Sequence, residues 1–418
     1  MNSFKIAIIG MGYVGLPLAL ALSKKFKVIG FDSSVKRIDS LKKFKDLNNE
    51  HSFNEIKSRK KLLSFSKSHN EINNCNVYII CVPTPLKQKN KPDLSFLYEA
   101  TKLIVNKIKK NDLIIFESTV YPGATEEVVS KVFSKKKFEV NKDYYLGYSP
   151  ERVNPGDKKH NIKNVTKVIS GSNKIAIKKI NEIYSSVIKK IHIASSIKIA
   201  ESAKIIENTQ RDINIALINE FSILFNKMDI DFSEVLKAAR TKWNFLDFKP
   251  GLVGGHCIGV DPYYLTYKCK KIGYRPRIIL AGRKINDQMA QYIVSKIKKK
   301  FSQNKIILKN SNLLLIGLAF KENCSDIRNS QYLKIYKMLI NQGIKVDLWD
   351  PLVANSVHSK NYNFLKKPNK KYDGIIISHK HKVMKSLNYK LIEKISKKNS
   401  LIFDLKNILK NKLVNFKL

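Results

Sequence analysis

The chain has 418 residues, of which 43% are hydrophobic and 27% are charged. This length allows two or three domains with sizeable cores, and the composition is ordinary for a globular protein. No apolar run is long enough to cross a membrane, and the five cysteines are too few and too scattered for a disulfide framework or a zinc site. We therefore expect a cytoplasmic protein that carries no metal.

The formal net charge of +44 would suit a nucleic-acid-binding protein. However, only nine of the 78 basic residues are arginines, and the lysines are spread along the whole chain among many Ile and Asn residues. This distribution is typical of an AT-rich coding sequence, and no DNA- or RNA-binding motif accompanies it. We therefore expect neither a nucleic acid nor a membrane as partner, whereas the positive field would favour an anionic substrate.

The N-terminal part predicts alternating strands and helices. FKIAII (4–9) predicts a buried strand, the run from Leu16 to about Lys25 a helix, and KVIGFD a strand that ends at Asp32. A further helix is expected near 93–110. Three more apolar runs end in small or polar residues, as parallel strands of a doubly wound sheet do: NVYIICVPTP, DLIIFESTV and YYLGYSPE.

The middle of the chain predicts helices, and the C-terminal part predicts a second strand series. One long helix without Gly or Pro is expected from Ile197 to about Asn226, followed by FSEVLKAAR, which Asp231 or Ser233 would cap. The glycine-rich loop GGHCIGVDPYYL (254–265) and a helix near 280–300 come next. A second βαβ series starts near Ser311, but it lacks the full glycine fingerprint and need not bind a dinucleotide.

GMGYVG has the spacing of a dinucleotide-binding turn between a strand and a helix. Gly10 would allow the tight turn, Gly12 would let backbone approach a pyrophosphate, and Gly15 would let the helix pack on the strand. Asp32 would accept hydrogen bonds from a ribose diol, which favours NAD over NADP, and Arg37 weakens this preference slightly. The alternative is a glycine turn that binds no nucleotide. The predicted cofactor residues in this region are Gly10, Gly12, Tyr13, Val14, Gly15, Asp32 and Arg37.

Polar residues follow the next predicted strands, where ligands bind in open α/β sheets. Thr84 and Thr119 are candidates to contact the cofactor or a reactive water, and Glu151 is a candidate general base. The alternative for each is a strand cap or turn residue. In the long helix, Lys204, Asn208 and Arg211 have the spacing of one helical face. This face would stabilise a developing oxyanion, unless it is a solvated polar stripe.

Cys257 lies between Gly255-His256 and Ile258-Gly259, in a loop where backbone can approach a ligand. A thiolate beside a nicotinamide cofactor would trap an aldehyde. A structural cysteine in a tight turn is the alternative. Metal binding by His256, Cys257 and Asp261 is less favoured, because adjacent residues of an extended segment point in opposite directions.

Together, these pieces resemble the UDP-glucose/UDP-N-acetylhexosamine 6-dehydrogenase family over essentially the whole chain. The motifs that carry the resemblance are GMGYVGLPLA, CVPTP, ESTVYPG, SPERVNPG, KIIENTQRDINIALINE, GGHCIGVDPYYL and GLAFKENCSDIRNS. The implied fold class is α/β, with two Rossmann-like doubly wound domains joined by a long-helix dimerisation core. The expected domains are an NAD-binding domain (1–196), a central helical and catalytic-loop domain (197–303) and a UDP-sugar-binding domain (304–418). A homodimer through the central helices is expected.

The resemblance also implies a four-electron oxidation at sugar C6 with two NAD, supplying polysaccharide biosynthesis. Cys257 would form a thiohemiacetal and then a thioester. Lys204 and Asn208 would stabilise the oxyanion, Asp261 with Thr119 would position water, and Glu151 would assist proton transfer. Further implied cofactor contacts are Thr84, Thr119 and Arg328. The implied substrate contacts are Glu151, Arg152, Lys204, Asn208, Arg211, Lys249, Gly251, Gly255, His256, Tyr263 and Lys321.

The loop around the cysteine indicates the sugar. Relatives that oxidise UDP-glucose carry a GGSCFPKD-like sequence, whereas this chain has His256 before the cysteine and Ile258-Gly259-Val260 after it. That form resembles the N-acetylhexosamine branch, and the PYYL ending is most similar to enzymes that act on UDP-N-acetylglucosamine. UDP-ManNAc, UDP-GalNAc and UDP-glucose stay as alternatives. Ser325 stands where relatives often have proline.

Two rival hypotheses are a second type of dehydrogenase and a protein of another class. A one-hydride dehydrogenase of the 3-hydroxyacid or 6-phosphogluconate type would need neither Cys257 nor the second βαβ series. A basic nucleic-acid-binding protein with a decayed Rossmann fold would not need the intact glycine fingerprint.

Overall fold

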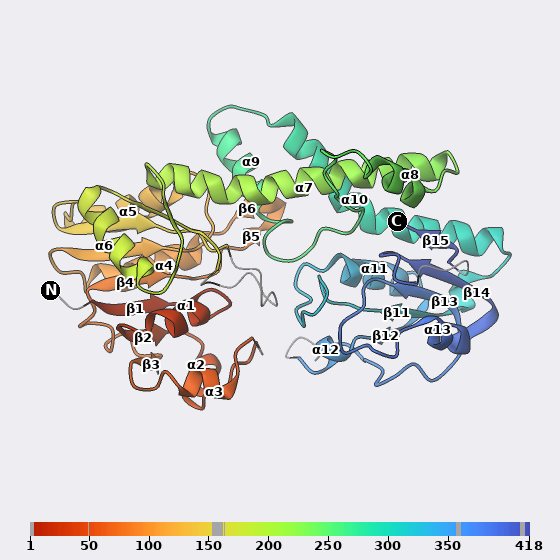
Figure 1. Cartoon of the computed structure of the whole chain (residues 1–418), viewed down its shortest axis with the longest axis horizontal. Helices are drawn as coiled ribbons and strands as arrows, with labels where there is room; N and C mark the ends of the chain where they lie inside the picture. Colours follow the sequence, from red (N-terminus) through yellow and green to blue (C-terminus); the bar gives the residue numbers. More distant parts are fainter. Residues whose placement is uncertain (1–3, 49, 153–161, 163, 357–360, 410–413) are drawn as a thin grey trace. The chain divides into compact units, whose positions relative to one another are not determined.

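A computed structural model describes residues 4–48, 50–152, 162, 164–356, 361–409 and 414–418 (Figure 1). The chain divides into two compact units, Met1–Glu207 with Tyr263–Arg275 and Asn208–Pro262 with Pro276–Leu418. Two of the three boundaries fall inside helices, namely α7 (Ile197–Lys227) and α9 (Asp261–Lys271). The expected three-part division at 196/197 and 303/304 stays a prediction.

The first unit is built on an eight-stranded sheet in the order β10-β9-β8-β7-β4-β1-β2-β3. All neighbouring strands are parallel except β8 and β9, which are antiparallel. The strands are β1 (Lys5–Ile9), β2 (Lys27–Phe31), β3 (Leu63–Ser66), β4 (Val77–Ile80), β7 (Asp112–Phe116), β8 (Tyr144–Tyr148), β9 (Lys167–Gly171) and β10 (Ile191–Ile193). The central strands are continuous apolar runs because helices cover both faces of a parallel sheet.

The helices of this unit are α1 (Gly15–Leu22), α2 (Val35–Lys42), α3 (Phe53–Lys57), α4 (Ser95–Val105), α5 (Ala124–Phe133) and α6 (Lys174–Ser185). A short hairpin of β5 (Leu86–Lys87) and β6 (Lys91–Pro92) follows β4. The predicted strand–turn–helix–strand unit at the N-terminus is therefore confirmed. The antiparallel pairing of β9 was not predicted.

The second unit contains a five-stranded parallel sheet in the order β12-β11-β13-β14-β15. Its strands are β11 (Asn312–Ile316), β12 (Lys345–Trp349), β13 (Tyr372–Ile377), β14 (Ser396–Asp404) and β15 (Phe416–Lys417). Its helices are α8 (Phe232–Ala239), α10 (Arg277–Gln303), α11 (Gln331–Ile340), α12 (Pro351–Ala354) and α13 (Tyr389–Ile395). The predicted second βαβ series is therefore present.

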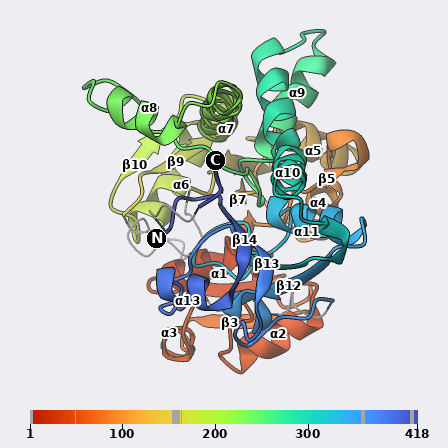
Figure 2. The ribbon, with the colours of Figure 1, turned by 90° about the vertical axis from the view of Figure 1, so that its right-hand side faces the viewer.

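Alternate residues of β11 enter different cores. Leu313 and Leu315 belong to the core that includes α10 and α11, whereas Leu314 and Ile316 belong to the core that includes α13. Figure 2 shows α11 and α13 on opposite sides of these strands. This alternation follows from the two-residue period of a strand, and it places helices on both faces of the sheet. The second unit thus has the layered architecture of a Rossmann-like domain.

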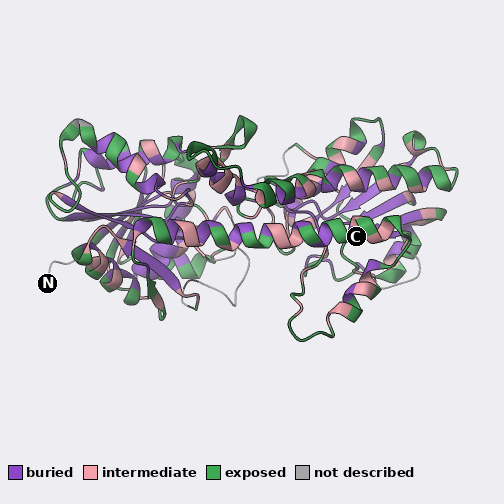
Figure 3. Ribbon diagram, turned by 90° about the horizontal axis from the view of Figure 1, so that it is seen from above, coloured by how far each residue is buried: buried purple, intermediate pink, exposed green. Residues whose placement is uncertain are grey.

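The long helix α7 is continuous, as the absence of Gly and Pro predicts. Buried and exposed residues alternate along it (Figure 3). Asp231 caps the following helix α8, since its side chain accepts a hydrogen bond from Ser233 N–H at 2.8 Å. Within the part of the chain that the structure describes, no helix is both long and apolar enough to cross a bilayer.

The glycine-rich loop is shorter than expected. It ends at Val260, because α9 begins at Asp261. Pro262 lies in the first helical turn, where its fixed φ suits a helix and its missing N–H costs nothing. The turn before the helix is closed by Cys257 O, which accepts hydrogen bonds from the N–H groups of Val260 (2.9 Å) and Asp261 (2.8 Å).

Candidate active site

The glycine turn of the first unit has the shape that a dinucleotide requires. Gly10 has φ +97°, and a Cβ on it would lie 2.8 Å from Cys81 O, while a Cβ on Gly15 would lie 1.8 Å from Gly10 O. Only glycine fits at these two positions. At Gly12, by contrast, an added Cβ would meet nothing within 4 Å, so the backbone is open for a pyrophosphate to approach.

Asp32 and Arg37 both contact the turn. Asp32 accepts hydrogen bonds from Met11 N–H and Ser34 N–H, each at 2.8 Å. The buried Arg37 guanidinium donates to Met11 O at 2.7 Å and to Asp46 at 2.6 Å. Arg37 therefore stabilises the turn from within the unit. An open glycine backbone, the start of α1 and an acid at the end of β2 together fit NAD.

Thr84 and Thr119 lie side by side at the carboxyl ends of neighbouring strands. The Thr84 hydroxyl donates to Thr119 O at 2.8 Å, and Thr84 O accepts from the Tyr264 hydroxyl at 2.7 Å. The structure thus brings these two predicted residues together, although 35 positions separate them. Tyr264 of α9, which was not predicted, supports the pair.

A buried cluster beside Glu151 was not predicted from the sequence. Glu117 accepts hydrogen bonds from Lys167 and from the Tyr184 hydroxyl, and all three side chains are buried. Burial raises the pKa of Glu117 to about 7, although the Lys167 charge opposes this. Lys167 also donates to Pro150 O at 3.2 Å, which fixes the backbone next to Glu151. Glu117 belongs to the ESTVYPG motif, and that position was the available signal.

Arg152 follows Glu151 and pairs with Glu207 at 2.8 Å. Its guanidinium also donates to Thr166 O at 2.9 Å. These partners hold the start of the SPERVNPG motif. Residues 153–156 of that motif lie outside the described residues.

On α7, Lys204 and Asn208 are buried one turn apart, whereas Arg211 is exposed. The third member of the predicted face therefore has a different environment from the first two. Glu201, which was not predicted, is fully buried one turn before Lys204. It accepts hydrogen bonds from Gly123 N–H (2.5 Å) and Thr125 N–H (2.9 Å) at the start of α5.

Glu201 thereby fixes the part of α7 that carries Lys204. Burial raises the pKa of Glu201 to about 7, and the two backbone hydrogen bonds only partly offset that effect. Its position three residues before Lys204 places it on an adjacent part of the helix surface.

In the second unit, the Cys257 loop lies beside α7. The Asn208 amide donates to the Asp261 carboxylate at 2.5 Å, and both side chains are buried. Cys257 itself is exposed, and its carbonyl accepts from the Asp261 N–H. The structure thus brings three predicted catalytic residues of this unit together. The five cysteines, all among the described residues, form no disulfide.

The segment before the loop is held by a residue that was not predicted. Asn219 of α7 accepts from Gly251 N–H at 2.8 Å and donates to Gly251 O at 2.9 Å. Asn219 also donates to Asn286, which in turn donates to Asp212. This buried network positions Gly251, one of the predicted substrate contacts. Asn219 lies three helical turns after Asn208, so the periodicity of α7 was the available signal.

The other predicted contacts of the second unit are more exposed. Lys249 is exposed and Lys321 is partly buried. Arg328 pairs with the buried Asp326 at 3.0 Å, and Asp326 also lies 2.9 Å from His256. Tyr263, which belongs to the first unit, is partly buried.

One cluster has the composition of a metal site: Asp350, His379 and His381. Its hydrogen bonds indicate a different role. Asn323 N–H donates to His381 Nδ1 at 2.9 Å, so the imidazole proton resides on Nε2, which lies 3.1 Å from Asp350. An Nε2 atom that carries the proton has no lone pair to offer a metal. The cluster is therefore a structural Asp–His pair.

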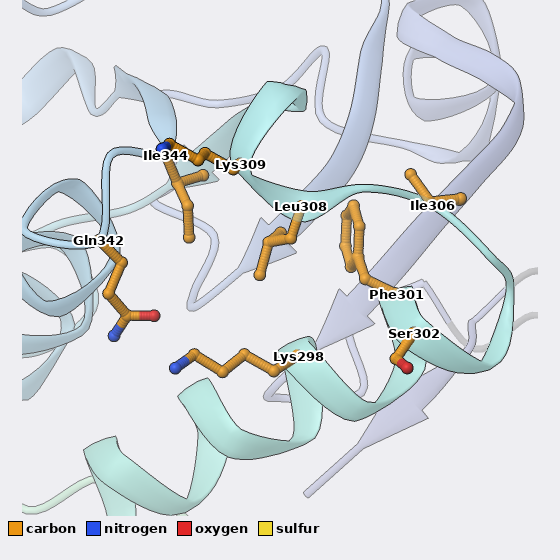
Figure 4. Close-up of a pocket in the computed structure, with 8 residues that line it drawn as sticks. All are labelled: Lys298, Phe301, Ser302, Ile306, Leu308, Lys309, Gln342 and Ile344. Atoms are coloured by element: carbon orange, nitrogen blue, oxygen red, sulfur yellow. The ribbon is translucent and has the colours of Figure 1, made fainter.

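A pocket of about 380 Å³ lies elsewhere in the second unit (Figure 4). It is lined by Lys298, Phe301, Ser302, Ile306, Leu308, Lys309, Gln342 and Ile344. None of these is a predicted site residue. The main candidate site residues of the first unit lie at the glycine turn, the strand ends and the start of α7, and those of the second unit lie on the rest of α7 and in the Cys257 loop.

Three parts of the chain match domains of one family. Residues 4–188, 198–288 and 314–411 match the NAD binding, central and UDP binding domains of the UDP-glucose/GDP-mannose dehydrogenase family. The chain is 46% identical to UDP-N-acetyl-D-glucosamine 6-dehydrogenase from Pseudomonas aeruginosa, covering 98% of each chain. It is 45% identical to the protein of that name from Salmonella typhi, covering 98% of this chain and 97% of the relative.

The fold is similar to that of the UDP-D-ManNAc dehydrogenase from Pyrococcus horikoshii, with a TM-score of 0.88 at 29% identity. That likeness covers 99% of this chain and 98% of the other. The matched domains and the fit of the glycine turn agree on the cofactor and on the type of reaction. The chain therefore belongs to the UDP-glucose/GDP-mannose dehydrogenase family and is an NAD-dependent oxidoreductase that acts on nucleotide sugars.

Proposed function

We propose that the chain oxidises the C6 hydroxymethyl group of UDP-N-acetylglucosamine to a carboxylate, using two NAD, and so supplies polysaccharide biosynthesis in the cytoplasm. Relatives that are 45–46% identical over nearly the full chain bear the name of this activity. The His256, Ile258, Gly259 and Val260 pattern of the loop points to the same sugar class. The observation that carries the chemistry is the Asn208–Asp261 hydrogen bond at the base of the Cys257 loop.

NAD, held at the glycine turn, would supply the hydride acceptor for each of the two oxidations. The Cys257 thiolate adds to the aldehyde carbon after the first oxidation, which forms a thiohemiacetal. Loss of a second hydride from that carbon gives a thioester. Water then attacks the thioester carbonyl, and the C–S bond breaks to release the carboxylate and the thiolate.

The remaining residues stabilise charge or move protons. Lys204 and Asn208 donate to the oxygen that gains negative charge in each tetrahedral species. An amide NH₂ group carries two donors, so Asn208 can hold Asp261 and still donate to a substrate oxygen. Asp261 and Thr119 position the water, and Glu151 moves its proton. Arg152, Lys249 and Lys321 bind the anionic and sugar groups of the substrate.

The first test replaces the nucleophile. We expect the wild-type protein to form two NADH per UDP-GlcNAc, and Cys257→Ser to lose net acid formation by about three orders of magnitude or more. Cys269→Ser, a buried cysteine in α9, is the matched control and should keep its turnover. Full acid formation by Cys257→Ser would exclude the thioester route.

The second test addresses the sugar. UDP-GlcNAc, UDP-ManNAc, UDP-GalNAc and UDP-glucose are offered separately with NAD, and kcat/KM is compared. UDP-GlcNAc should be preferred. Preference for UDP-ManNAc, the substrate in the names of relatives at 31–33% identity, or for UDP-glucose would overturn the assignment. A product that stops at the aldehyde would favour a one-hydride dehydrogenase.

A homodimer is part of this proposal. Leu217, Phe221 and Leu224 of α7 are exposed, and their spacing places them on one side of the helix; Met228, which directly follows α7, is exposed as well. Trp243, in the segment after α8, is 92% exposed. A stripe of this kind is typical of a covered interface, and a second copy would cover it. Leu217→Glu combined with Leu224→Glu should give monomers in light scattering, whereas Ile307→Glu at another exposed position should not.

A further inference from the structure

The loop that carries Cys257 is tied to the segment of residues 317–330 within the second unit. His256 Nε2 lies 2.9 Å from the Asp326 carboxylate. Gly255 N–H donates to Asn329 O, and the Asn329 side chain donates back to Gly255 O, both at 3.3 Å. The oxidation itself does not need these contacts, so they indicate a role in positioning.

Phe320 makes the fit between the two segments close. Gly255 has φ +82°, and a Cβ on it would lie 2.6 Å from the Phe320 ring. The His256 ring meets Phe320 edge to face, with 6.0 Å between centroids. Phe320 N–H donates to Asp326 O at 3.1 Å, so the residue that packs against the loop and the residue that pairs with His256 are held together.

Asp326 is a fixed anion. Its side chain is 2% exposed and accepts from Arg328 N–H at 2.9 Å and from the Arg328 guanidinium at 3.0 Å. Burial acts to raise the pKa of Asp326, but the hydrogen bonds from His256 and Arg328 outweigh it and hold the pKa well below its ordinary value. A hydrogen bond from His256 to this carboxylate is therefore charge-assisted and stronger than a neutral one.

The same segment is fixed to the sheet at its other end. Leu318 N–H donates to Asp350 at 2.7 Å, and Asn323 N–H donates to His381 at 2.9 Å. Both acceptor side chains are fully buried. The segment 317–330 therefore connects the carboxyl ends of β12 and β13 with His256, the residue that precedes Cys257.

Cys257 lies between two such ties. His256 is held by Asp326 on one side, and Asp261 is held by Asn208 on the other. We propose that His256 is a positioning residue, which acts by pairing with Asp326 and transmits UDP binding at the 317–330 segment to the orientation of Cys257. This inference rests on the proposed function, since it requires the UDP part of the substrate to bind the segment that contains Lys321.

The test uses UDP alone as the probe, because UDP lacks the sugar that reacts. The alkylation rate of Cys257 by iodoacetamide is measured by mass spectrometry of its peptide, with and without saturating UDP. In the wild-type protein UDP should change this rate by about fivefold or more. In His256→Ala the response should disappear at a UDP concentration that calorimetry shows to saturate the variant. In His256→Gln part of it should return, because the amide N–H can still donate to Asp326.

Steady-state kinetics add an independent readout. A mispositioned thiolate should lower kcat more than it raises KM in His256→Ala. His51→Ala, which removes a histidine paired with Glu55 in the first unit, is the matched control and should behave as wild type. Failure of the wild-type protein to bind UDP would overturn the proposed function. Binding of UDP without a change at Cys257, or an undiminished response in His256→Ala, would overturn this inference alone.

Discussion

The two units share a local arrangement at the start of their sheets. In each, a strand ends in a left-handed glycine, Gly10 with φ +97° and Gly317 with φ +84°. In each, that glycine's N–H donates to the end of the next strand, at 2.8 Å in the first unit and 3.0 Å in the second. An aspartate follows that next strand and accepts from the residue after the glycine, Asp32 at 2.8 Å and Asp350 at 2.7 Å.

The surroundings of the two aspartates differ. Asp32 is partly exposed, and α1 begins at Gly15, so the first turn leads directly to a helix N-terminus. Asp350 is fully buried, and the chain runs from Gly317 to Ser330 before α11 begins. Asp350 also accepts from three more backbone N–H groups and pairs with His381. The same glycine–aspartate turn is thus open to solvent in the first unit, where it can accept a cofactor, whereas in the second unit its aspartate is buried and holds the backbone in place.

Removing the two aspartates should separate these roles. Asp350→Ala should lower the free energy of unfolding by about 3–5 kcal/mol, because it leaves buried N–H groups and His381 without their acceptor. Asp32→Ala, the matched change in the first unit, should cost about 1 kcal/mol, because water can reach its donors. Urea denaturation measures both. Equal losses would show that burial does not distinguish the two aspartates.

The two glycines provide the next comparison. A Cβ at Gly10 would lie 2.8 Å from the backbone oxygen of Cys81, whereas a Cβ at Gly317 would lie 2.6 Å from the Ser378 hydroxyl. Alanine at either position is strained by the positive φ. The clash at Gly317 can be relieved because it involves a side chain, whereas the clash at Gly10 involves backbone and cannot. We expect Gly10→Ala to cost about 2–3 kcal/mol and Gly317→Ala slightly less.

The double variant Gly317→Ala with Ser378→Ala tests whether the clash with Ser378 causes the loss of stability in Gly317→Ala. The double variant should recover part of the loss in thermal or urea unfolding, because the clashing oxygen is gone. No recovery would assign the whole cost of Gly317→Ala to its backbone conformation.

Of the two aspartates, only Asp32 should affect the affinity for the cofactor. Losing hydrogen bonds from a ribose to a carboxylate costs about 1.5–2 kcal/mol, so Asp32→Ala should weaken NADH binding by about 10- to 30-fold. Asp350→Asn, at the turn of the second unit, should leave NADH binding unchanged. Fluorescence titration of NADH checks both variants. A loss of affinity in Asp350→Asn would mean that the second turn also binds the cofactor.

How well the sequence predicts a contact depends on how far apart its two residues lie in the chain. The turn and helix around the glycines and the long α7 follow from residues close together in the chain, and these elements are confirmed. The ribose contact of Asp32 stays a prediction. Helix α9 (Asp261–Lys271) was not predicted, although Pro262 is a local signal for its start.

Pairs far apart in the chain have no periodic signature. His256 meets Asp326 across 70 positions, and Glu201 meets Thr125 across 76. Such contacts arise only when separate elements pack together. The sequence therefore identifies the reactive residues more readily than the residues that hold them.

The last prediction compares two buried carboxylates by their response to pH. Glu201 in the first unit has two backbone donors, and burial raises its pKa from 4.5 to about 7. Asp350 in the second unit is also buried, but His381 and the backbone donors outweigh burial and lower its pKa below 3.8. The folded protein therefore binds more protons than the unfolded chain through Glu201, and fewer through Asp350.

The two carboxylates therefore change the stability with pH in opposite directions. The contribution of Glu201 is present below its unfolded pKa of 4.5 and is lost as pH rises through about 7, whereas that of Asp350 is present above 3.8 and is lost as pH falls below it. Glu201→Gln should therefore remove about 1 kcal/mol of the fall in unfolding free energy between about pH 6 and pH 7. Asp350→Asn should not change how the free energy of unfolding varies between about pH 6 and pH 7, and should alter it only at acidic pH. Urea titrations across pH decide the matter, because an unchanged slope in Glu201→Gln would show that the carboxylate stays ionised and that two backbone N–H groups suffice to stabilise a buried charge.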